Sequence, residues 1–464
     1  MAAAALAVMA VALFYAPVHL GIEPMWVLIG AALLPLALFA MRYWPMILMT
    51  ALLFVGNFKN VPAQGITWTD PTMVLLLLCA GALVLELLYD VSGTSAWSVS
   101  RLFAGQGAVI LVFLLFTAMF LVSFSYTQAI EYGAMKSLRF AAFEMLAFLA
   151  PILLLKKKQD LDQLVKATVL LSLLLVARDV LNLLNPPKRV LEGNADITQI
   201  GDGMLLAITI LIVMYHGAAR SRAINYSLSV VLVVGVIASA ARSPMVALLV
   251  TVLICGWSGS NILNIVSRKK ILVGIGLALL VTVPSLLWFA ELPGVGSKLA
   301  WKEAELAAFT SGSALSSGTI GERLSFYRSA LEAVKENPMF GLGAGGWSTY
   351  YSKLGVTRFP HNFLLEVAAE QGLVGFVLLI SLLAMLFRSA YRLMSYRQFA
   401  FLFPVLLFCT IYNMVTGDIE NRDLWFWLGM VAAGSRMARD DNALPVTAQA
   451  DFRFTYEYAH GGSA

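Results

Sequence analysis

Charged residues are scarce in this sequence. Only 13% of its 464 residues are Asp, Glu, Lys or Arg, whereas 60% are hydrophobic and the mean hydropathy is +0.81. Soluble globular domains carry about 25% charged residues, so the composition excludes an ordinary soluble domain. Apolar runs long enough to cross a bilayer recur along the chain. Because a backbone in lipid must satisfy its own hydrogen bonds, we predict an all-α polytopic integral membrane protein.

Cysteine and histidine are also rare, with three and four copies respectively. The three cysteines, Cys79, Cys255 and Cys409, each lie in an apolar run and share no close spacing, which is typical of small buried hydrophobic residues. No His-Glu-x-x-His, clustered Cys/His or Asp-x-Asp element is present. We therefore expect no metal site, no cofactor and no nucleic-acid partner.

Long apolar runs divide the chain into membrane spans. The first 20 residues carry no charge, so they lack the basic start of a cleaved signal peptide and we expect them to form the first span. The sequence predicts fourteen spans, at 2–18, 24–41, 45–57, 71–89, 104–124, 137–155, 164–184, 203–219, 224–241, 244–258, 271–289, 363–387, 399–416 and 421–437. The third and tenth are short enough to be half-helices, so twelve spans is the alternative.

Basic clusters set the orientation of these spans. They fall in connections of one parity, which the positive-inside rule places in the cytoplasm, together with both termini. The chain then divides into N-terminal transmembrane helices (1–289), a large outer loop (290–362), C-terminal transmembrane helices (363–437) and a cytoplasmic tail (438–464).

The stretch 319–375 is the most polar long segment between two apolar spans. Thr319 and Glu322 have capping-box spacing, and an apolar stripe follows until Pro338, which predicts a helix within the outer loop. A glycine-rich run, GLGAGG, comes next. It is not a dinucleotide fingerprint, because a helix and not a strand precedes it.

Several cations lie on the predicted outer side, where the orientation rule does not require them. They are Lys136, Arg139, Lys188, Arg189, Arg242, Arg323, Arg328, Arg358 and Arg422. Either each pairs with a nearby acid or lipid head group, or they converge on a polyanion such as a phosphate. Arg242 stands apart, because it occupies a break between two apolar runs with no acid within ten residues.

His361 marks the point where the outer loop meets the next span. It either hydrogen-bonds a carbonyl as an ordinary helix-start residue, or it orients a substrate or accepts its proton. Asn362 is positioned to cap the following helix. Glu366 and Glu370 then enter the membrane on the same helix face, where a carboxylate requires a partner. Arg178, in the seventh span, is a candidate for that partner.

Three segments together resemble a known family: GERLSFYRSALEAVKENPMFGLGAGGW, FPHNFLLEVAAEQGLVG and TGDIENRDLWFWLGM. They are similar to the C-terminal half of the O-antigen ligase and polymerase superfamily, most of all to the ligases. AARSPMVALL resembles the arginine-containing break between two mid-chain spans of that family, and EYGAMKSLRF an element of its N-terminal half.

The resemblance implies a metal-independent glycosyltransferase at the periplasmic face of the bacterial inner membrane. The donor would be a glycan on undecaprenyl pyrophosphate, and the acceptor a lipid A–core sugar. By motif, the family's pyrophosphate-binding arginines correspond to Arg242 and Arg323, and its histidine to His361. In-line attack would invert the anomeric carbon. Further candidates for substrate binding are Lys136, Arg139, Arg328, Asn362 and Arg189.

The resemblance leaves alternatives open. A polymerase of O-antigen or exopolysaccharide would use the end of another lipid-linked repeat as acceptor. A polysaccharide or lipid transporter would also be polytopic, but it would show internal symmetry and would not need His361. A membrane scaffold would explain none of the outer arginines. His361 would act either as a base or as a group that orients the acceptor.

Overall fold

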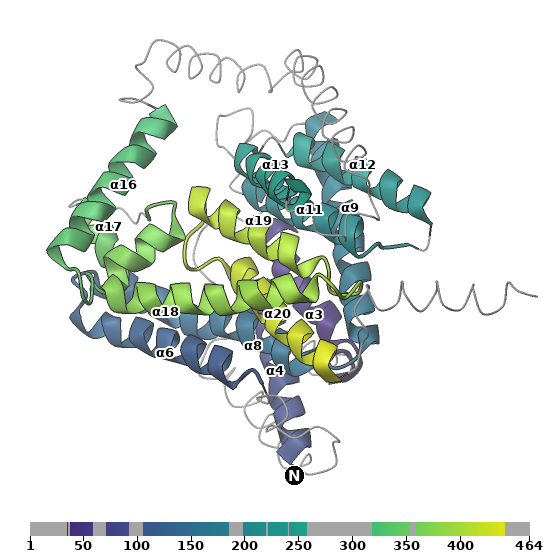
Figure 1. Cartoon of the computed structure of the whole chain (residues 1–464), viewed down its shortest axis with the longest axis horizontal. Coiled ribbons are helices and arrows are strands. Elements are labelled where there is room, and N and C mark those ends of the chain that lie inside the picture. Colours follow the sequence, from purple (N-terminus) through teal and green to yellow (C-terminus); the bar gives the residue numbers. More distant parts are fainter. Residues whose placement is uncertain are drawn as a thin grey trace, which may run out of the picture.

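The computed structural model describes residues 35, 38–58, 71–91, 105–184, 198–219, 221–239, 241–257, 318–352 and 359–440. Every regular element in this part of the chain is helical, which confirms the predicted all-α class (Figure 1). The elements are α3 (Pro45–Val55), η1 (Gly56–Phe58), α4 (Pro71–Val91), α6 (Gly107–Ser123), η2 (Phe124–Tyr126), α7 (Ile130–Arg139), η3 (Phe140–Glu144), α8 (Met145–Leu154), α9 (Lys158–Leu184), α11 (Thr198–Tyr215), α12 (Arg222–Ala238), α13 (Arg242–Trp257), α16 (Gly318–Glu336), α17 (Gly346–Tyr351), α18 (Phe363–Leu393), α19 (Leu402–Val415) and α20 (Arg422–Asp440).

Three continuous helical stretches in the described residues are long and apolar enough to cross a membrane: Gly107–Tyr126, Ile130–Leu154 and Phe363–Leu393. Six shorter apolar helices accompany them, at Pro45–Phe58, Val74–Leu85, Ile200–Tyr215, Arg222–Ala238, Ser243–Gly256 and Leu402–Val415. The chain is therefore an all-α membrane protein. The predicted spans 2–18 and 271–289 lie outside the described residues, as does most of 24–41.

The helix predicted at 137–155 begins earlier, at Ile130. Glu131, Lys136 and Arg139 lower the hydropathy of its first turns, so hydropathy alone detects only the apolar remainder. Residues 140–144 form a single π-helical turn, a feature that often marks functional sites.

A layer of aromatic rings joins four helical elements, α6, η3, α8 and α20. Phe113 of α6 stacks on Phe148 of α8 with ring centroids 3.9 Å apart, and Phe120 stacks on Phe140 at 4.5 Å. Trp425 of α20 meets Phe140 edge-on at 5.2 Å. Because lipid is as apolar as these side chains, close packing and polar contacts hold membrane helices together. This aromatic layer therefore fixes α6, α8 and α20 relative to one another.

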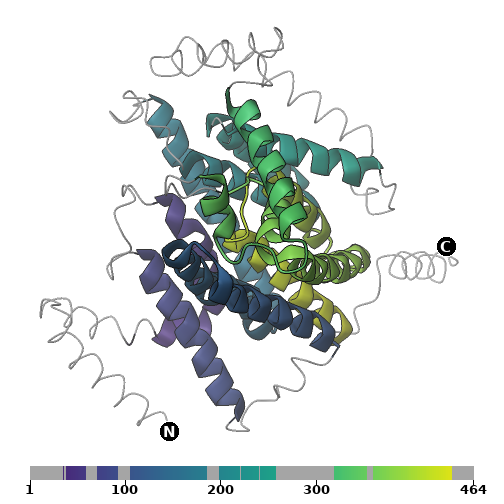
Figure 2. The same cartoon turned by 90° about the vertical axis from the view of Figure 1, so that its left-hand side faces the viewer.

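Helices α16 and α17 lie over the beginning of α18, as both views show (Figures 1 and 2). A separate apolar cluster joins them to α18, formed by Phe326, Ala330, Ala333, Trp347 and Ala369. α16 ends at Glu336, two residues before Pro338, so the helix predicted within the outer loop is confirmed together with its stop.

Candidate active site

His361 lies immediately before α18 in an unusual backbone conformation. Its φ of 55° is left-handed, which costs a residue other than glycine about 1–3 kcal/mol and is common at functional sites. Its Nδ1 lies 3.3 Å from the carbonyl oxygen of Thr416, which can only accept, so Nδ1 carries the proton. The remaining ring nitrogen, Nε2, has no hydrogen-bond partner among the described residues and keeps its lone pair.

Neighbouring side chains hold the imidazole in this position. Phe326 of α16 stacks on it with centroids 5.8 Å apart, and Phe359 lies 4.4 Å away. Asn362 caps α18, since its side-chain oxygen accepts from the amides of Leu364 and Leu365 at 3.1 Å each. The predicted cap is confirmed, and this oxygen is occupied by the helix start.

Arg323 reaches the same place from α16. Its guanidinium donates to the carbonyl oxygen of Val415 at 2.9 Å, next to the carbonyl that accepts from His361. No described carboxylate forms an ion pair with Arg323, so its charge is available. Burial, reinforced by the positive charge of Arg323, lowers the pKa of His361 below its ordinary value.

Arg328 is also on α16, but it lies on another face. Five residues along a helix correspond to a rotation of about 140°, so Arg323 and Arg328 cannot present their side chains together. Arg328 is exposed, whereas Arg323 is half-buried against α19. The structure thus brings Arg323, and not Arg328, to His361.

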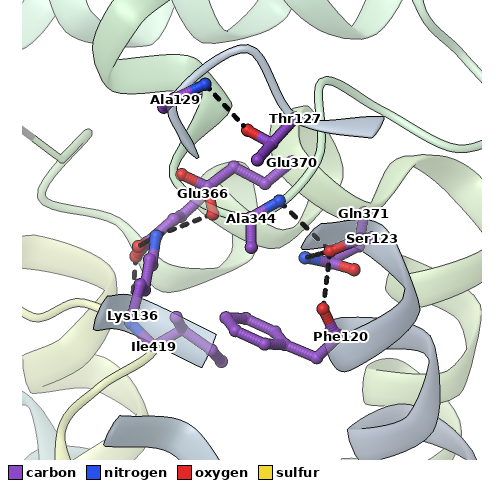
Figure 3. Close-up of polar contacts among 10 residues, drawn as sticks. All are labelled: Phe120, Ser123, Thr127, Ala129, Lys136, Ala344, Glu366, Glu370, Gln371 and Ile419. Carbon is purple, nitrogen blue, oxygen red and sulfur yellow. Dashed lines mark hydrogen bonds and ion pairs between the residues drawn. The ribbon is translucent and has the colours of Figure 1, made fainter. Parts of the chain in front are cut away.

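Lys136 has a different environment. Its side chain is buried, and its Nζ lies 2.5 Å from Glu366 and 2.7 Å from Glu370, both on α18 (Figure 3). The second oxygen of Glu366 accepts from the amide of Ile419 at 2.9 Å. Of the two interpretations of the outer cations, pairing with an acid therefore describes Lys136.

Arg178 is not the partner of these glutamates, which corrects that expectation. It pairs with Asp202 of α11 and with Asp179, its neighbour in α9, at 2.8 Å. It also donates to the carbonyl of Asn57, whose side chain binds Asp202 at 2.8 Å. Asp202 could not be identified as the partner from the sequence, because it follows a connection that separates α9 from α11.

Arg139 ends α7 and is half-buried, and its charge acts on two acids of residues 416–421, hereafter the α19–α20 connection. It lies within electrostatic reach of Asp418 and Glu420, and no described acid forms an ion pair with it. Burial raises the pKa of Asp418 to about 7 and that of Glu420 to about 8. These two acids were missed from the sequence, although two acids in so short a connection are a detectable signal.

The residues around Arg242 approach the same connection. The backbone of Arg242 begins α13, which packs on α19; the prediction for its side chain lies outside the described part of the structure, as does Arg189. Gly203 of α11 is so close to Ala241 that an added Cβ would lie 3.1 Å from the alanine Cβ. The next residue, Met204, accepts from Asn421 at 3.8 Å. The start of α13 is thus linked to the α19–α20 connection through α11.

The glycine-rich loop, residues 337–345, is joined to a break in α18. Gly372 has φ 63° and ψ −162°, which interrupts the helix. Four backbone hydrogen bonds of 2.8 to 3.2 Å bridge the break: Leu373 to Pro338, Val374 to Met339, Leu342 to Ala369 and Gly343 to Glu370. Ser123 of α6 fixes the same region, since its hydroxyl oxygen accepts from the amide of Ala344 and from Gln371 (Figure 3).

Comparison with known proteins agrees with this arrangement. Residues 227–380 match the family model described as O-antigen ligase. The matched region runs from α12 through α18 and includes Arg242, Arg323 and His361. No curated protein matches the chain.

The match supports a glycosyltransferase activity of the O-antigen ligase and polymerase type, and the membrane-length helices agree with a bacterial membrane protein. Residues 227–380 of the chain are thus similar to the O-antigen ligase family.

Proposed function

We propose that this protein transfers a glycan from undecaprenyl pyrophosphate to a lipid A–core sugar at the periplasmic face of the bacterial inner membrane. One observation carries the proposal: Arg323, whose charge no described acid neutralises, and His361 bind adjacent carbonyl oxygens at the end of α19. A cation for the leaving group and a nitrogen for the acceptor proton thus lie together.

In the proposed reaction, the acceptor hydroxyl oxygen attacks the anomeric carbon of the donor sugar. The carbon–oxygen bond to pyrophosphate breaks, and its electron pair leaves with the undecaprenyl pyrophosphate. Attack in line with the leaving group inverts the anomeric carbon. Negative charge grows on the departing phosphate oxygen, where a preorganised guanidinium stabilises it.

Arg323 supplies that charge, and we assign Arg139 and Arg242 to the same phosphate group. The charge of Arg139 acts on acids of the same connection, and the start of α13 approaches it. The arginines make the transfer independent of a metal ion in this proposal. We do not include Lys136, because its charge is balanced by two glutamates. We assign Arg328 and Asn362 no part in the reaction, because Arg328 is exposed and the side chain of Asn362 caps α18.

His361 accepts the hydroxyl proton on Nε2. The hydrogen bond from Nδ1 to Thr416 selects the tautomer in which Nε2 is unprotonated. The lowered pKa keeps the ring neutral near pH 7, as a general base must be. General base catalysis of this kind contributes about 10²–10⁴-fold to a rate.

Reconstitution tests the proposal directly. The purified protein is placed in liposomes with a lipid-linked glycan donor and a truncated lipid A–core acceptor, with a chelator present. We expect glycan on the lipid A–core product. Lengthening of the lipid-linked chains in place of core attachment would identify a polymerase, and the absence of both products would reject glycosyl transfer.

A further inference from the structure

Glu366 connects two parts of the site that are distant in sequence. Its Oε1 accepts from Lys136 of α7 at 2.5 Å, and its Oε2 accepts from the amide of Ile419 at 2.9 Å (Figure 3). The residue itself is fully buried, as is Lys136 at 1% exposure. Both carboxylate oxygens therefore have partners within the protein, and the group is not available to bind substrate.

Ile419 is held from both sides. Its amide donates to Glu366, and its carbonyl accepts from the indole of Trp425 at 2.8 Å. Trp425 belongs to the aromatic layer that fixes α20. Three residues before Ile419, the carbonyl of Thr416 accepts from His361. The position of the carbonyl that orients the imidazole is thus tied to Glu366 through three peptide units.

We propose that Glu366 is a positioning residue for His361, held in place by Lys136. This inference rests on the proposed function, because it assigns Glu366 a part in the same transfer. When the side chain no longer offers two accepting oxygens, Lys136 and the buried amide of Ile419 compete for one acceptor, and the α19–α20 connection shifts. Displacement of a reacting group by about 1 Å costs roughly 10²-fold in rate, which sets the expected effect.

Glu370 provides a matched control. It binds the same Nζ of Lys136, and it faces the backbone amide of Gly345 instead of the α19–α20 connection. Glu366→Gln and Glu370→Gln remove the same charge from the same lysine. Only the first weakens the contact with Ile419. Glu366→Asp is the second variant: it keeps the negative charge, but its shorter side chain cannot reach both Lys136 and Ile419.

The experiment measures three quantities in the full-length protein: the transfer rate, the affinity for the donor, and the titration of His361 by NMR. The His361 signal is assigned by comparison with His361→Gln. The groups that face the imidazole are Arg323 and Glu322 of α16, Glu366 of α18 and the Thr416 carbonyl. Loss of the hydrogen bond to Thr416 and loss of the Glu366 charge would each lower the titration midpoint of His361. Glu366→Asp retains the charge, so a lower midpoint in this variant reports the hydrogen bond alone.

We expect Glu366→Gln and Glu366→Asp to lower kcat by roughly 10²-fold with donor affinity changed by less than about threefold. Both should lower the titration midpoint of His361, whereas Glu370→Gln should not. Equal loss in Glu366→Gln and Glu370→Gln, or an unchanged midpoint in Glu366→Asp, would overturn the inference. Because the midpoint needs no turnover, it separates this outcome from a wild-type protein that transfers no glycan, which would reject only the proposed function.

Discussion

Arg323 and His361 donate hydrogen bonds to consecutive carbonyl oxygens, those of Val415 and Thr416. Arg323 belongs to α16 and His361 lies just before α18, yet both contact the backbone at the end of α19, where Val415 is its last residue and Thr416 is the next. Because both are fixed to the same backbone, movement of α19 would carry the cation and the imidazole together. This arrangement also explains why the charge of Arg323 acts on the pKa of His361.

The first prediction concerns pH. If neutral His361 accepts the hydroxyl proton, transfer rises with pH through its pKa and is constant above it. Burial and Arg323 lower that pKa, so the rising limb should lie below the ordinary value of about 6.5. A pH–rate profile of the reconstituted protein measures this limb.

Replacement of His361 tests the same role. We expect His361→Ala to lose transfer but keep binding of the lipid-linked donor, because the arginines remain. His361→Gln should also be inactive, since an amide cannot accept the proton. Appreciable activity of the glutamine variant without a pH limb would instead mean that the side chain only orients the acceptor, and loss of donor binding in the alanine variant would assign it to the phosphate site.

The second prediction concerns the phosphate. Arg323→Ala should abolish transfer and weaken donor binding. Arg323→Lys should keep only part of the transfer activity, because the planar two-point contact of a guanidinium with phosphate oxygens is lost. Arg242→Ala should behave in the same way. Lys335→Ala is the matched control, since this exposed cation lies in the last turn of the same helix. Near-normal transfer by Arg323→Ala would remove it from the site.

The sequence predicted the elements of this site better than their contacts. The capped start of α18 and the helix that ends before Pro338 follow from local patterns that the structure confirms. The partner of Glu366 and Glu370 could not be predicted in this way, because ion pairs between helices depend on packing that local spacing does not encode. Lys136 was assigned to substrate for the same reason: its neighbours in space lie more than 200 residues away.

The third prediction concerns the buried ion pairs of Lys136. Lys136→Met leaves two uncompensated carboxylates in the interior, and breaking a buried pair in this way costs about 3–5 kcal/mol. The triple variant with Glu366→Gln and Glu370→Gln should recover most of the lost stability while remaining impaired in transfer. Thermal unfolding in detergent measures the stability of both variants and the transfer assay measures their activity, with Glu131→Ala, at an exposed position of the same helix, as the control. Equal stability of Lys136→Met and wild type would contradict the pairing.

The fourth prediction concerns orientation in the membrane. A cysteine at Ser313 should react with an impermeant reagent from outside, and one at Ser221, which is exposed at the start of α12, only after permeabilisation. The native residues Cys79, Cys255 and Cys409 are buried and should give little background. Labelling of Ser221→Cys in intact cells would reverse the orientation and remove the periplasmic assignment of the site.

The last prediction concerns the junction between the glycine-rich loop and α18. Both Gly341 and Gly372 have positive φ, and a Cβ would lie 2.5 Å from the Glu370 backbone at the first and 2.4 Å from the Met339 carbonyl at the second. Gly341→Ala and Gly372→Ala should each lower stability by about 1–3 kcal/mol from backbone strain alone, and further through the clash. Gly256→Ala is the control, because nothing lies within 4 Å of its added Cβ and alanine favours a helix.

Transfer should fall in the first two variants as well, because the loop connects α18 to the helix that carries Arg323. Unfolding midpoints and transfer rates of the three variants decide the matter. If Gly341→Ala and Gly372→Ala unfold like Gly256→Ala, the four backbone hydrogen bonds at the break do not hold α16 in place, and the position of Arg323 must have another cause.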